Sequence, residues 1–273
     1  MTATDWPNAT MVLRLAGPLQ AWGSSSRFNR RETGTEPTKS GIVGLLAAAS
    51  GRRRADPIED LVGLQLAIRT DQPGTVLRDY HTVSDYWGEP LKSSNVNAKG
   101  QQKFTSPPKF THVTQRFYLQ DAVFVAAIGG AASLIEGLAH SLQHPAFPLA
   151  LGRRSCVPTQ PLLLRPPADQ GLSGSASVWQ GSPVDVLGCV PWQASRRHVE
   201  AFGRSTARAS RIDVPVVADD PAGDDIRADL PVSFVPTERA FTTRRVRNLW
   251  VSLATPFQDA PREVHDPFAL LGW

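Results

Sequence analysis

The first apolar segments of the chain predict a buried strand followed by a buried helix. Residues 10–16 form an almost unbroken aliphatic run, as in a strand that is covered by the core. Residues 39–50 carry apolar side chains around most of a helical circumference, and such a helix is buried. Thr38 or Ser40 can cap its N-terminus, and Gly51 suits the position after its last turn.

The pattern continues with alternating strand and helix signals. We expect strands at residues 64–70, 76–83, 110–120, 122–128 and 161–164, and an amphipathic helix at residues 131–143. The 76–83 strand extends the strand before it or pairs with it. The order is that of a ferredoxin-like βαββαβ unit, the plan that RNA-recognition motifs share, in which two helices back an antiparallel sheet. The fold class is therefore α+β.

The second half of the chain carries a weaker pattern of short strands. We expect strands that begin at Val184, Arg211, Leu230 and Asn248, with an acidic, solvated turn at residues 219–229. These segments predict a β-rich part, residues 166–273, that packs on a palm formed by residues 1–165. Residues 84–108 have almost no aliphatic side chains, so we expect a protruding excursion from the palm.

Composition allows many functions and excludes few. The chain has 273 residues, 41% of them hydrophobic, and a formal net charge of +4, which permits a polyanionic partner without requiring one. Cys156 and Cys189 are not in a metal-binding motif, so we expect reduced thiols. We find no signal-peptide pattern and no apolar run that could span a bilayer, and expect a cytoplasmic protein.

The segment around the first helix is a candidate phosphate site. Lys39 and Ser40 lie at the N-terminus of that helix, where free N–H groups and the helix dipole favour an anion. Arg27 in the preceding loop adds charge, and Trp22 offers a flat face for a base. A capped, buried helix with Trp22 in the core explains the same residues equally well.

Two further segments are rich in groups that bind nucleic acid. Residues 152–155, Gly-Arg-Arg-Ser, can wrap a phosphate with main-chain and guanidinium donors, although an exposed turn is the simpler alternative. Residues 79–115 interleave basic and aromatic side chains, as single-strand binding requires, although they could also form a plain surface loop. The members of these two segments that we predict to contact RNA are Tyr80, His81, Lys103, Lys109, His112, Gly152, Arg153, Arg154 and Ser155.

Other candidates are weaker. His140 and His144 are four apart on the second helix and could share a metal, but no third ligand follows at a suitable spacing, so we expect no metal or cofactor. Arginines cluster at residues 196–211 and again at residues 244–247, where they could meet RNA, an acidic partner subunit or only solvent. No signature of a hydrolase or a metalloprotease occurs.

Four motifs in this order closely resemble the CasD subunits of type I-E CRISPR surveillance complexes (Cascade). They are LRLAGPLQAWG at 13–23, PTKSG at 37–41, LRDYHTV at 77–83 and LGRRSC at 151–156. The resemblance implies a ferredoxin-like palm with a long β-hairpin thumb, here about residues 84–112. It also implies that Gln20, Trp22, Lys39 and Ser40 line the palm and that residues 152–155 form its phosphate loop.

The same resemblance implies a function without catalysis. Such subunits bind the 5′ handle of the CRISPR RNA, cap one end of the backbone-subunit filament and touch the large PAM-recognising subunit, so target DNA is met only through the complex. The rival hypothesis is a metal-independent endoribonuclease, because type I-C relatives cleave repeat RNA with a Tyr, a Lys and a His, and Tyr80, His81, Lys109 and His112 supply these types. A free-standing RNA-recognition module is disfavoured, since no aromatic RNP-like strand occurs.

Overall fold

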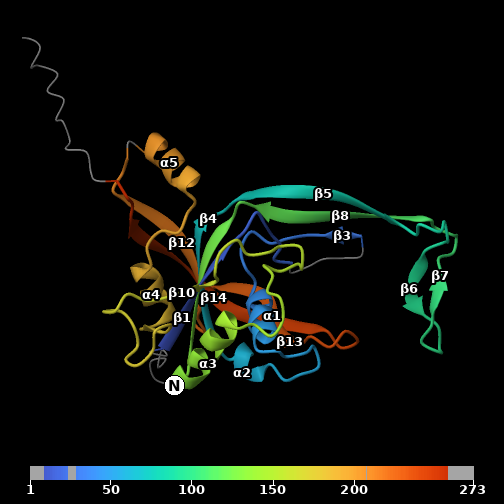
Figure 1. Cartoon of the computed structure of the whole chain (residues 1–273), viewed down its shortest axis with the longest axis horizontal. Helices are drawn as coiled ribbons and strands as arrows, with labels where there is room; N and C mark the ends of the chain where they lie inside the picture. Colours follow the sequence, from blue (N-terminus) through green and yellow to red (C-terminus); the bar gives the residue numbers. More distant parts are fainter. Residues whose placement is uncertain (1–8, 24–28, 207, 258–273) are drawn as a thin grey trace, which may run out of the picture.

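The chain folds into a mixed α+β body from which one long arm projects (Figure 1). The computed structural model describes residues 9–23, 29–206 and 208–257. The body is built on a mostly antiparallel sheet of order β10-β1-β9-β4-β12-β14-β13, and β11 also pairs with β1. Its strands are β1 (Ala9–Ala16), β4 (Gln65–Gln72), β9 (Val123–Gly130), β10 (Leu163–Leu164), β11 (Trp179–Gln180), β12 (Arg211–Asp219), β13 (Asp225–Ser233) and β14 (Ala240–Ala254).

Helices cover both faces of this sheet. They are α1 (Lys39–Ala49), α2 (Glu59–Val62), α3 (Ala132–Gln143), α4 (Pro183–Cys189) and α5 (Arg196–Ser205). The face with α1 and α3 buries the odd-numbered β1 side chains Met11, Leu13 and Leu15, whereas Val12 joins a second cluster with Leu187 of α4. The central strands are therefore apolar on both sides, which explains their unbroken aliphatic runs.

Helix α1 forms where the sequence predicts it, because its signals are local. The Gly41 N–H donates to Thr38 Oγ1 at 3.2 Å, so Thr38 is the N-cap. Gly51 follows the last turn with a φ of 77°, the left-handed conformation that favours glycine. Among the described residues, no helix is long and apolar enough to cross a bilayer.

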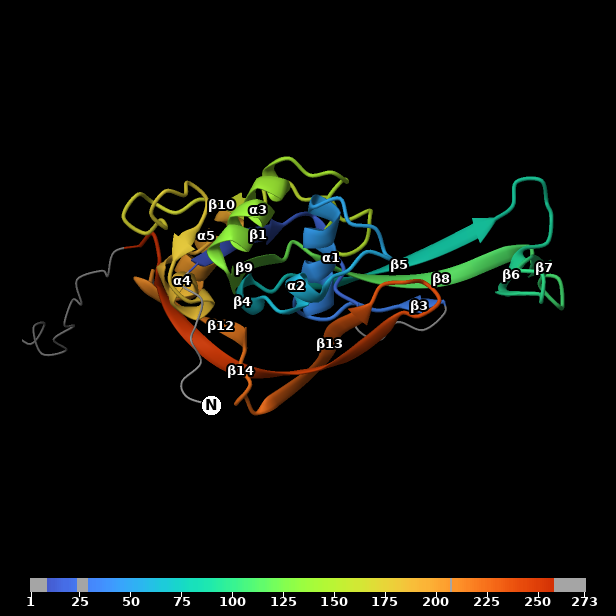
Figure 2. The same ribbon diagram turned by 90° about the horizontal axis from the view of Figure 1, so that it is seen from below.

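The arm is a two-stranded ribbon of β5 (Thr75–Ser84) and β8 (Thr111–Gln120) that projects from the body (Figures 1 and 2). The two strands pair residue by residue from Thr75–Gln120 to Ser84–Thr111. β6 (Lys92–Val96) and β7 (Gln102–Phe104) form the tip, and β2 (Leu19–Gln20) and β3 (Arg30–Arg31) flank β8 near the body. The hairpin thus begins well before the predicted residues 84–112, and β5 pairs with β8 and not with β4.

Gly74 marks the point where the chain leaves the body for the arm. Its φ is 72°, and a Cβ there would lie only 2.5 Å from the Gln120 carbonyl oxygen. A residue with a side chain would therefore be strained and would also push the two arm strands apart. This close approach lets β5 turn away from β4 and pair with β8.

The C-terminal half extends the main sheet beyond β4. β12 pairs antiparallel with β4 through Val216–Arg69, Val217–Ile68 and Ala218–Ala67, so the sheet runs across the predicted division at residue 165. Two local predictions need correction. The segment from Val184 is helix α4 and not a strand, and it has Ser182 as its N-cap and a proline in its first turn. The acidic turn does separate two strands, but it spans only residues 220–224, because β12 ends at Asp219 and β13 begins at Asp225.

Candidate nucleic-acid interface

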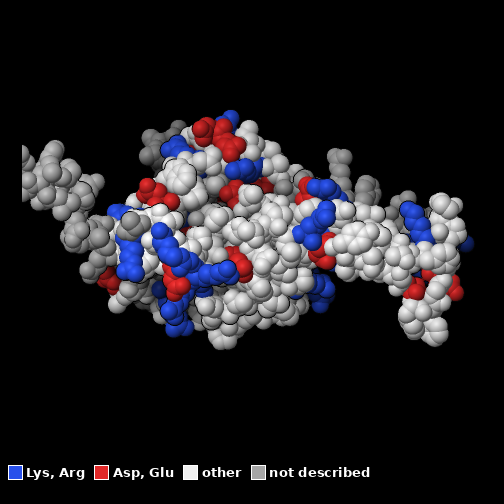
Figure 3. Space-filling view, turned by 90° about the horizontal axis from the view of Figure 1, so that it is seen from above, with Lys and Arg blue, Asp and Glu red and all other residues white. Residues whose placement is uncertain are grey.

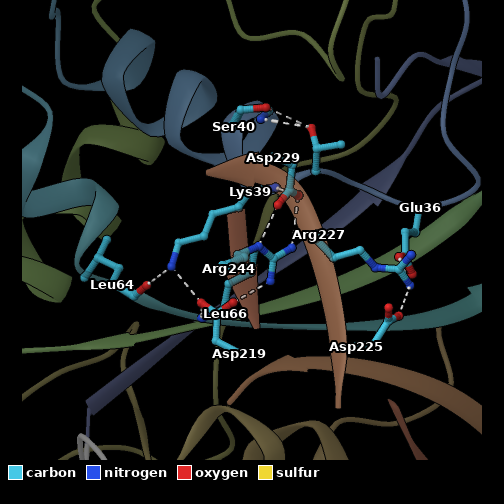
Figure 4. Close-up of polar contacts among 12 residues, drawn as sticks. Glu36, Lys39, Ser40, Leu64, Leu66, Asp219, Asp225, Arg227, Asp229 and Arg244 are labelled. Carbon is cyan, nitrogen blue, oxygen red and sulfur yellow. Dashed lines mark hydrogen bonds and ion pairs between the residues drawn. The ribbon is translucent and has the colours of Figure 1, made fainter. Parts of the chain in front are cut away.

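The N-terminus of α1 already holds an anion from the same chain. The Lys39 backbone N–H donates to Asp229 Oδ2 at 2.7 Å (Figure 4). The Lys39 ammonium donates to the Leu64 carbonyl and to Asp219 Oδ2, both at 2.7 Å, and the residue is only 7% exposed. The predicted phosphate site at this helix start is therefore corrected: the position that would attract a phosphate is filled by a carboxylate.

Arg244 closes these contacts into a buried ring of charges. Its guanidinium donates to both oxygens of Asp229, at 2.7 and 3.0 Å, and to Asp219 Oδ1. Burial by itself would lower the pKa of Arg244, but its hydrogen bonds to the two carboxylates and their charges raise it overall. Two cations and two carboxylates balance each other. The ring ties α1 to β12, β13 and β14, which explains part of the predicted arginine cluster at 244–247.

Gln20 and Trp22 are also used inside the protein. The Gln20 amide donates to the carbonyls of Leu15, at 3.0 Å, and Ala122, at 2.7 Å, and its oxygen accepts from Trp22 Nε1 at 3.0 Å. The Trp22 ring lies against Gly41, where a Cβ would come within 2.8 Å of it. Both side chains are almost fully buried, so the core alternative for Trp22 holds and neither presents a surface to RNA.

Ser40 and Arg27 are the other two residues of this segment that we predict to contact RNA. The Ser40 hydroxyl is half-buried and lies 3.3 Å from Thr38 Oγ1, within the cap of α1. Arg27 lies outside the described residues. The contribution of Ser40 and Arg27 to RNA binding stays a prediction.

The 152–155 loop is shaped by packing against the N-terminal segment. Gly152 has a φ of 91°, and a Cβ there would overlap the Ala21 carbonyl oxygen at 1.8 Å, so glycine is required. The Arg153 guanidinium donates to the carbonyls of Phe117, at 2.9 Å, and Arg31, at 2.7 Å. Arg153 thus joins β8 to β3 and is not free to wrap a phosphate.

Arg154 and Ser155 differ from their neighbour because they are exposed. They lie beside the base of the arm, where Arg153 reaches β8 and β3. Figure 3 shows Lys and Arg side chains gathered where the body meets the arm. Of the loop residues predicted to meet phosphate, these two have side chains that a ligand can reach.

One face of the arm base brings together two arginines and an aromatic ring. Residues 78 and 80 alternate onto the same face of β5, and their β8 partners are Phe117 and Gln115. Arg30 of β3 is the register partner of Gln115. Its guanidinium carbon lies over the Phe117 ring, 4.9 Å from the ring centroid, so Arg30 shares this face. Tyr80 is 64% exposed. We call Arg30, Arg78 and Tyr80 the arm face.

Tyr80 is among the RNA contacts that the sequence predicts, whereas Arg78 is not. The signal was present, because Arg78 is two positions from Tyr80 on a strand and must share its face. Arg30 could not be assigned to the same face from the sequence, because its register partner Gln115 is 85 positions away along the chain.

The predicted residues Lys103 and Lys109 belong to the tip of the arm and not to its base. Both are exposed, and the Lys109 N–H donates to Thr105 Oγ1 at 2.8 Å. Tyr86 and Trp87 lie in the same tip with ring centroids 4.7 Å apart and are highly exposed. The predicted contacts are therefore spread along the arm instead of converging at one point.

The residue types of the rival nuclease hypothesis do not share one face. Tyr80 and His81 are consecutive in a regular strand, so their side chains leave opposite faces of the ribbon. His81 Nδ1 lies 3.4 Å from Thr114 Oγ1, and His112 Nε2 lies 2.8 Å from Asn29 Oδ1. Acid–base cleavage needs these groups around one 2′-hydroxyl, and this ribbon directs Tyr80 away from His81.

The histidine pair and the cysteines do not form a metal site with other side chains of the described residues. His140 and His144 have ring centroids 4.8 Å apart, and within the described ranges no group of three or more His, Cys, Asp or Glu side chains could hold a metal. Both cysteines are free thiols, and burial raises the pKa of Cys156. Reactive cysteine nucleophiles have a lowered pKa, so the raised pKa of Cys156 does not suit a nucleophile.

Comparison with known proteins places the chain in a family. Residues 10–247 match the model of the family described as CRISPR-associated protein (Cas_Cas5). The Cascade subunit CasD of the CRISPR system of Escherichia coli (strain K12) is 39% identical over 173 residues, which are 56% of this chain and 69% of that protein. The chain therefore belongs to the Cas_Cas5 family of CRISPR-associated proteins. The CasD resemblance of its four motifs is confirmed.

Solved structures agree with this assignment. A chain of a "CRISPR RNA-guided surveillance complex" matches with a TM-score of 0.67 and 32% identity, covering 93% of this chain and 95% of that one. A crystal structure of a Cas protein matches with a TM-score of 0.58 and 28% identity, covering 89% and 94%. The likeness extends over most of the chain and not only over the motif-bearing half.

Proposed function

We propose that this chain is a non-catalytic, RNA-binding subunit of a type I-E surveillance complex, acts in the cytoplasm in antiviral defence, and binds and caps the 5′ handle of the CRISPR RNA. The arm face carries this proposal. Arg78 lies two positions from the exposed Tyr80 on β5, and Arg30, which pairs with Glu32 at 2.7 Å, lies across β8 on the same face. Cations on the same face as an aromatic platform suit a single strand, whose bases stack while its phosphates pair with charge. Arg154 and Ser155 extend the polar surface at the arm base.

We further propose that the body contains a ferredoxin-like palm and that the arm is its thumb. The supporting observation is the order β10-β1-β9-β4, in which β1-α1-β4 and β9-α3-β10 are two crossed-over halves of a βαββαβ unit. The arm is inserted between β4 and β9. In this proposal the exposed Lys103 and Lys109 of the tip contact the RNA that the arm base holds.

The partners that follow are the adjacent backbone subunit and the large PAM-recognising subunit. The long arm with its exposed Tyr86 and Trp87 suits a neighbour that covers it, since large aromatic side chains at interfaces supply much of the binding energy. The relatives' membership of CRISPR complexes supports the same assembly. Target DNA would be recognised through the assembled complex.

The test is binding of the full chain to fluorescent 5′-handle RNA, followed by anisotropy. Substituting Tyr80→Ala or Arg78→Glu should weaken binding about tenfold or more, as expected for one lost stacked base or phosphate contact of roughly 1–3 kcal/mol. The matched controls are Val83→Ala, an exposed apolar residue on the opposite ribbon face, and Arg54→Glu, an exposed arginine near α2. Equal losses in the controls would overturn the arm-face assignment.

The same protein distinguishes the scaffold from the nuclease. Repeat RNA incubated with the chain in EDTA should remain intact, whereas the alternative predicts metal-independent cleavage that is lost on Tyr80→Phe. Tyr80→Phe keeps the stacking ring, so it should leave handle affinity nearly unchanged if Tyr80 acts only as a platform. Specific cleavage that disappears with this substitution would replace the proposed function by the endoribonuclease.

A further inference from the structure

Helix α5 and the segment after it form a second basic surface that the arm does not explain. Residues 195–213 contain five arginines against the carboxylates of Glu200 and Asp213, a formal charge of +3 in a chain whose total is +4. We propose that this α5 surface binds the phosphate backbone of double-stranded DNA without reading its sequence. Its members are Arg196, Arg197, Arg204, Arg208 and Arg211, all of them exposed.

The surface lies apart from the arm. α5 is at the opposite end of the body from the arm tip (Figure 1), and Figure 3 shows blue side chains gathered over that end. A strand of handle RNA held at the arm base would therefore leave this surface open. The α5 site goes beyond the RNA-binding function proposed above and is tested separately from it.

The helix sorts its side chains by face. His198 and Phe202 turn toward the body, where each ring packs edge-on against Trp192 with centroids 5.9 and 5.4 Å away. Arg197 and Arg204 are seven residues apart and share the opposite face, about 10 Å from each other along the helix axis. The half-buried Phe257 ring packs against Gly203 of the same helix. The outer face thus offers exposed cations, and the helix itself carries no exposed aromatic ring.

This arrangement favours a duplex over a single strand. Single-strand sites combine cations with aromatic platforms on which bases stack, but the aromatic side chains of α5 are turned inward. Guanidinium groups without such platforms can still pair with phosphates, whose contacts position a duplex and carry no sequence information. Glu200 lies on the same helix and pairs with Arg196 at 2.9 Å, so Arg197 and Arg204 carry most of the unpaired charge of the helix.

Two arginines beyond the helix add charge to the α5 surface. Arg208 has a φ of 59°, the left-handed conformation that glycine adopts at helix ends, and its N–H donates to the Gly203 carbonyl at 2.9 Å. Glycine would fit this backbone conformation better than arginine does. Arg211 is exposed, but its guanidinium already donates to Ser252 Oγ at 3.1 Å and to the Ser252 carbonyl at 2.9 Å, so it contributes charge more than free donors.

The experiment measures binding of the full chain to a fluorescent 20-base-pair duplex of arbitrary sequence over a salt series. The double substitution Arg197→Glu with Arg204→Glu should weaken binding at least about tenfold and lower the slope of log affinity against log salt by about 2, one unit for each lost phosphate contact. The matched control, Arg53→Glu with Arg54→Glu, makes the same charge change on exposed residues beside α2 and should change affinity by less than about threefold.

The competing outcomes are distinct. Equal loss in the control pair, or tighter binding to single-stranded DNA of the same length, would overturn the proposal. Binding to polyglutamate but not to the duplex would assign the surface to an acidic protein instead. Handle-RNA affinity should not change in the α5 variant, so failure here is separable from failure of the arm face.

Arg208→Gly is a variant in which a loss of duplex binding could not be attributed to misfolding. It removes a charge and relieves the backbone conformation, so the melting temperature should rise while duplex affinity falls. A rise in melting temperature with unchanged duplex affinity would exclude Arg208 from the site.

Discussion

Glu36 lies at the edge of the buried charge ring, and its protonation is coupled to folding. Its side chain is 24% exposed and its Oε1 lies 3.2 Å from a guanidinium nitrogen of Arg227. Burial raises the pKa of Glu36 above its ordinary value of 4.5, although Arg227 and Arg244 oppose the shift. The folded protein therefore holds this proton to a higher pH than the unfolded chain does.

The sign of the resulting pH dependence is fixed by that difference. Because the folded state binds the extra proton, Glu36 lowers the free energy of unfolding as pH rises from 4.5 through its raised pKa. Glu36→Gln removes this cost, so the variant should be more stable than the parent at pH 7 and should lose that part of the pH dependence. Urea unfolding at several pH values measures it, with the exposed Glu238→Gln as control. If Glu36→Gln instead makes the protein less stable at pH 7, the ion pair with Arg227 outweighs burial.

Single residues were predictable from sequence where their environment is local. Neighbouring residues alone predict Thr38 or Ser40 as the cap of α1 and Gly51 as its end, and the structure has Thr38 and Gly51 in these positions. Lys39 was misassigned to a phosphate site because its partners Asp219 and Asp229 are 180 and 190 positions away. A helix N-terminus attracts any anion, and sequence does not show which carboxylate folds back to it.

At the scale of elements, the tip of the arm is separable from the ribbon that carries it. Ser84 and Thr111 are register partners at the end of the ribbon, so an Asn-Gly turn can replace residues 85–110 and close a two-residue hairpin. The body should then melt as before, because the tip lies at the far end of the arm from the body (Figures 1 and 2). Handle-RNA affinity should fall about tenfold through the loss of Lys103 and Lys109. Unchanged affinity would remove the tip from the proposed site and leave the arm base as the whole interface.

Elements were predictable where the hydrophobic period was unambiguous. The aliphatic runs of β1 and β9 mark core strands in any topology. The segment at Val184 alternates like a strand, but it forms helix α4. Ser182 caps this helix and Pro183 lies in its first turn, and both residues favour a helix start. The ribbon partner of β5 could not be read from its own residues, since pairing with β8 depends on the sharp turn at Gly74.

At the scale of the whole molecule, the two halves of the chain share one sheet and two buried ionic clusters. Besides the Lys39 ring, Arg69 and Asp71 of β4 form a fully buried pair, and Arg69 also donates to the Val190 carbonyl at 2.7 Å and the Pro191 carbonyl at 3.0 Å beyond α4. Removing one partner of a buried pair leaves an uncompensated charge, which typically costs about 3–5 kcal/mol. The sequence pattern predicts a β-rich part that packs on the palm, because strand signals do not show that β12 joins the edge of β4 in one sheet.

The shared sheet implies that the predicted palm does not fold without the second half. A fragment of residues 1–165 would expose the edge of β4, leave the Lys39 ammonium without Asp219 and deprive Arg69 of its carbonyl partners. We expect this fragment to show no cooperative thermal transition by circular dichroism, whereas co-expression with residues 166–273 should restore one. The matched control is the full chain cut at a protease site inserted before the exposed Ala168, which should remain one particle in size-exclusion chromatography because the β4–β12 pairing survives the cut. A cooperative transition of the fragment alone would instead establish residues 1–165 as an independent domain, with the charge ring joining two units that are each stable.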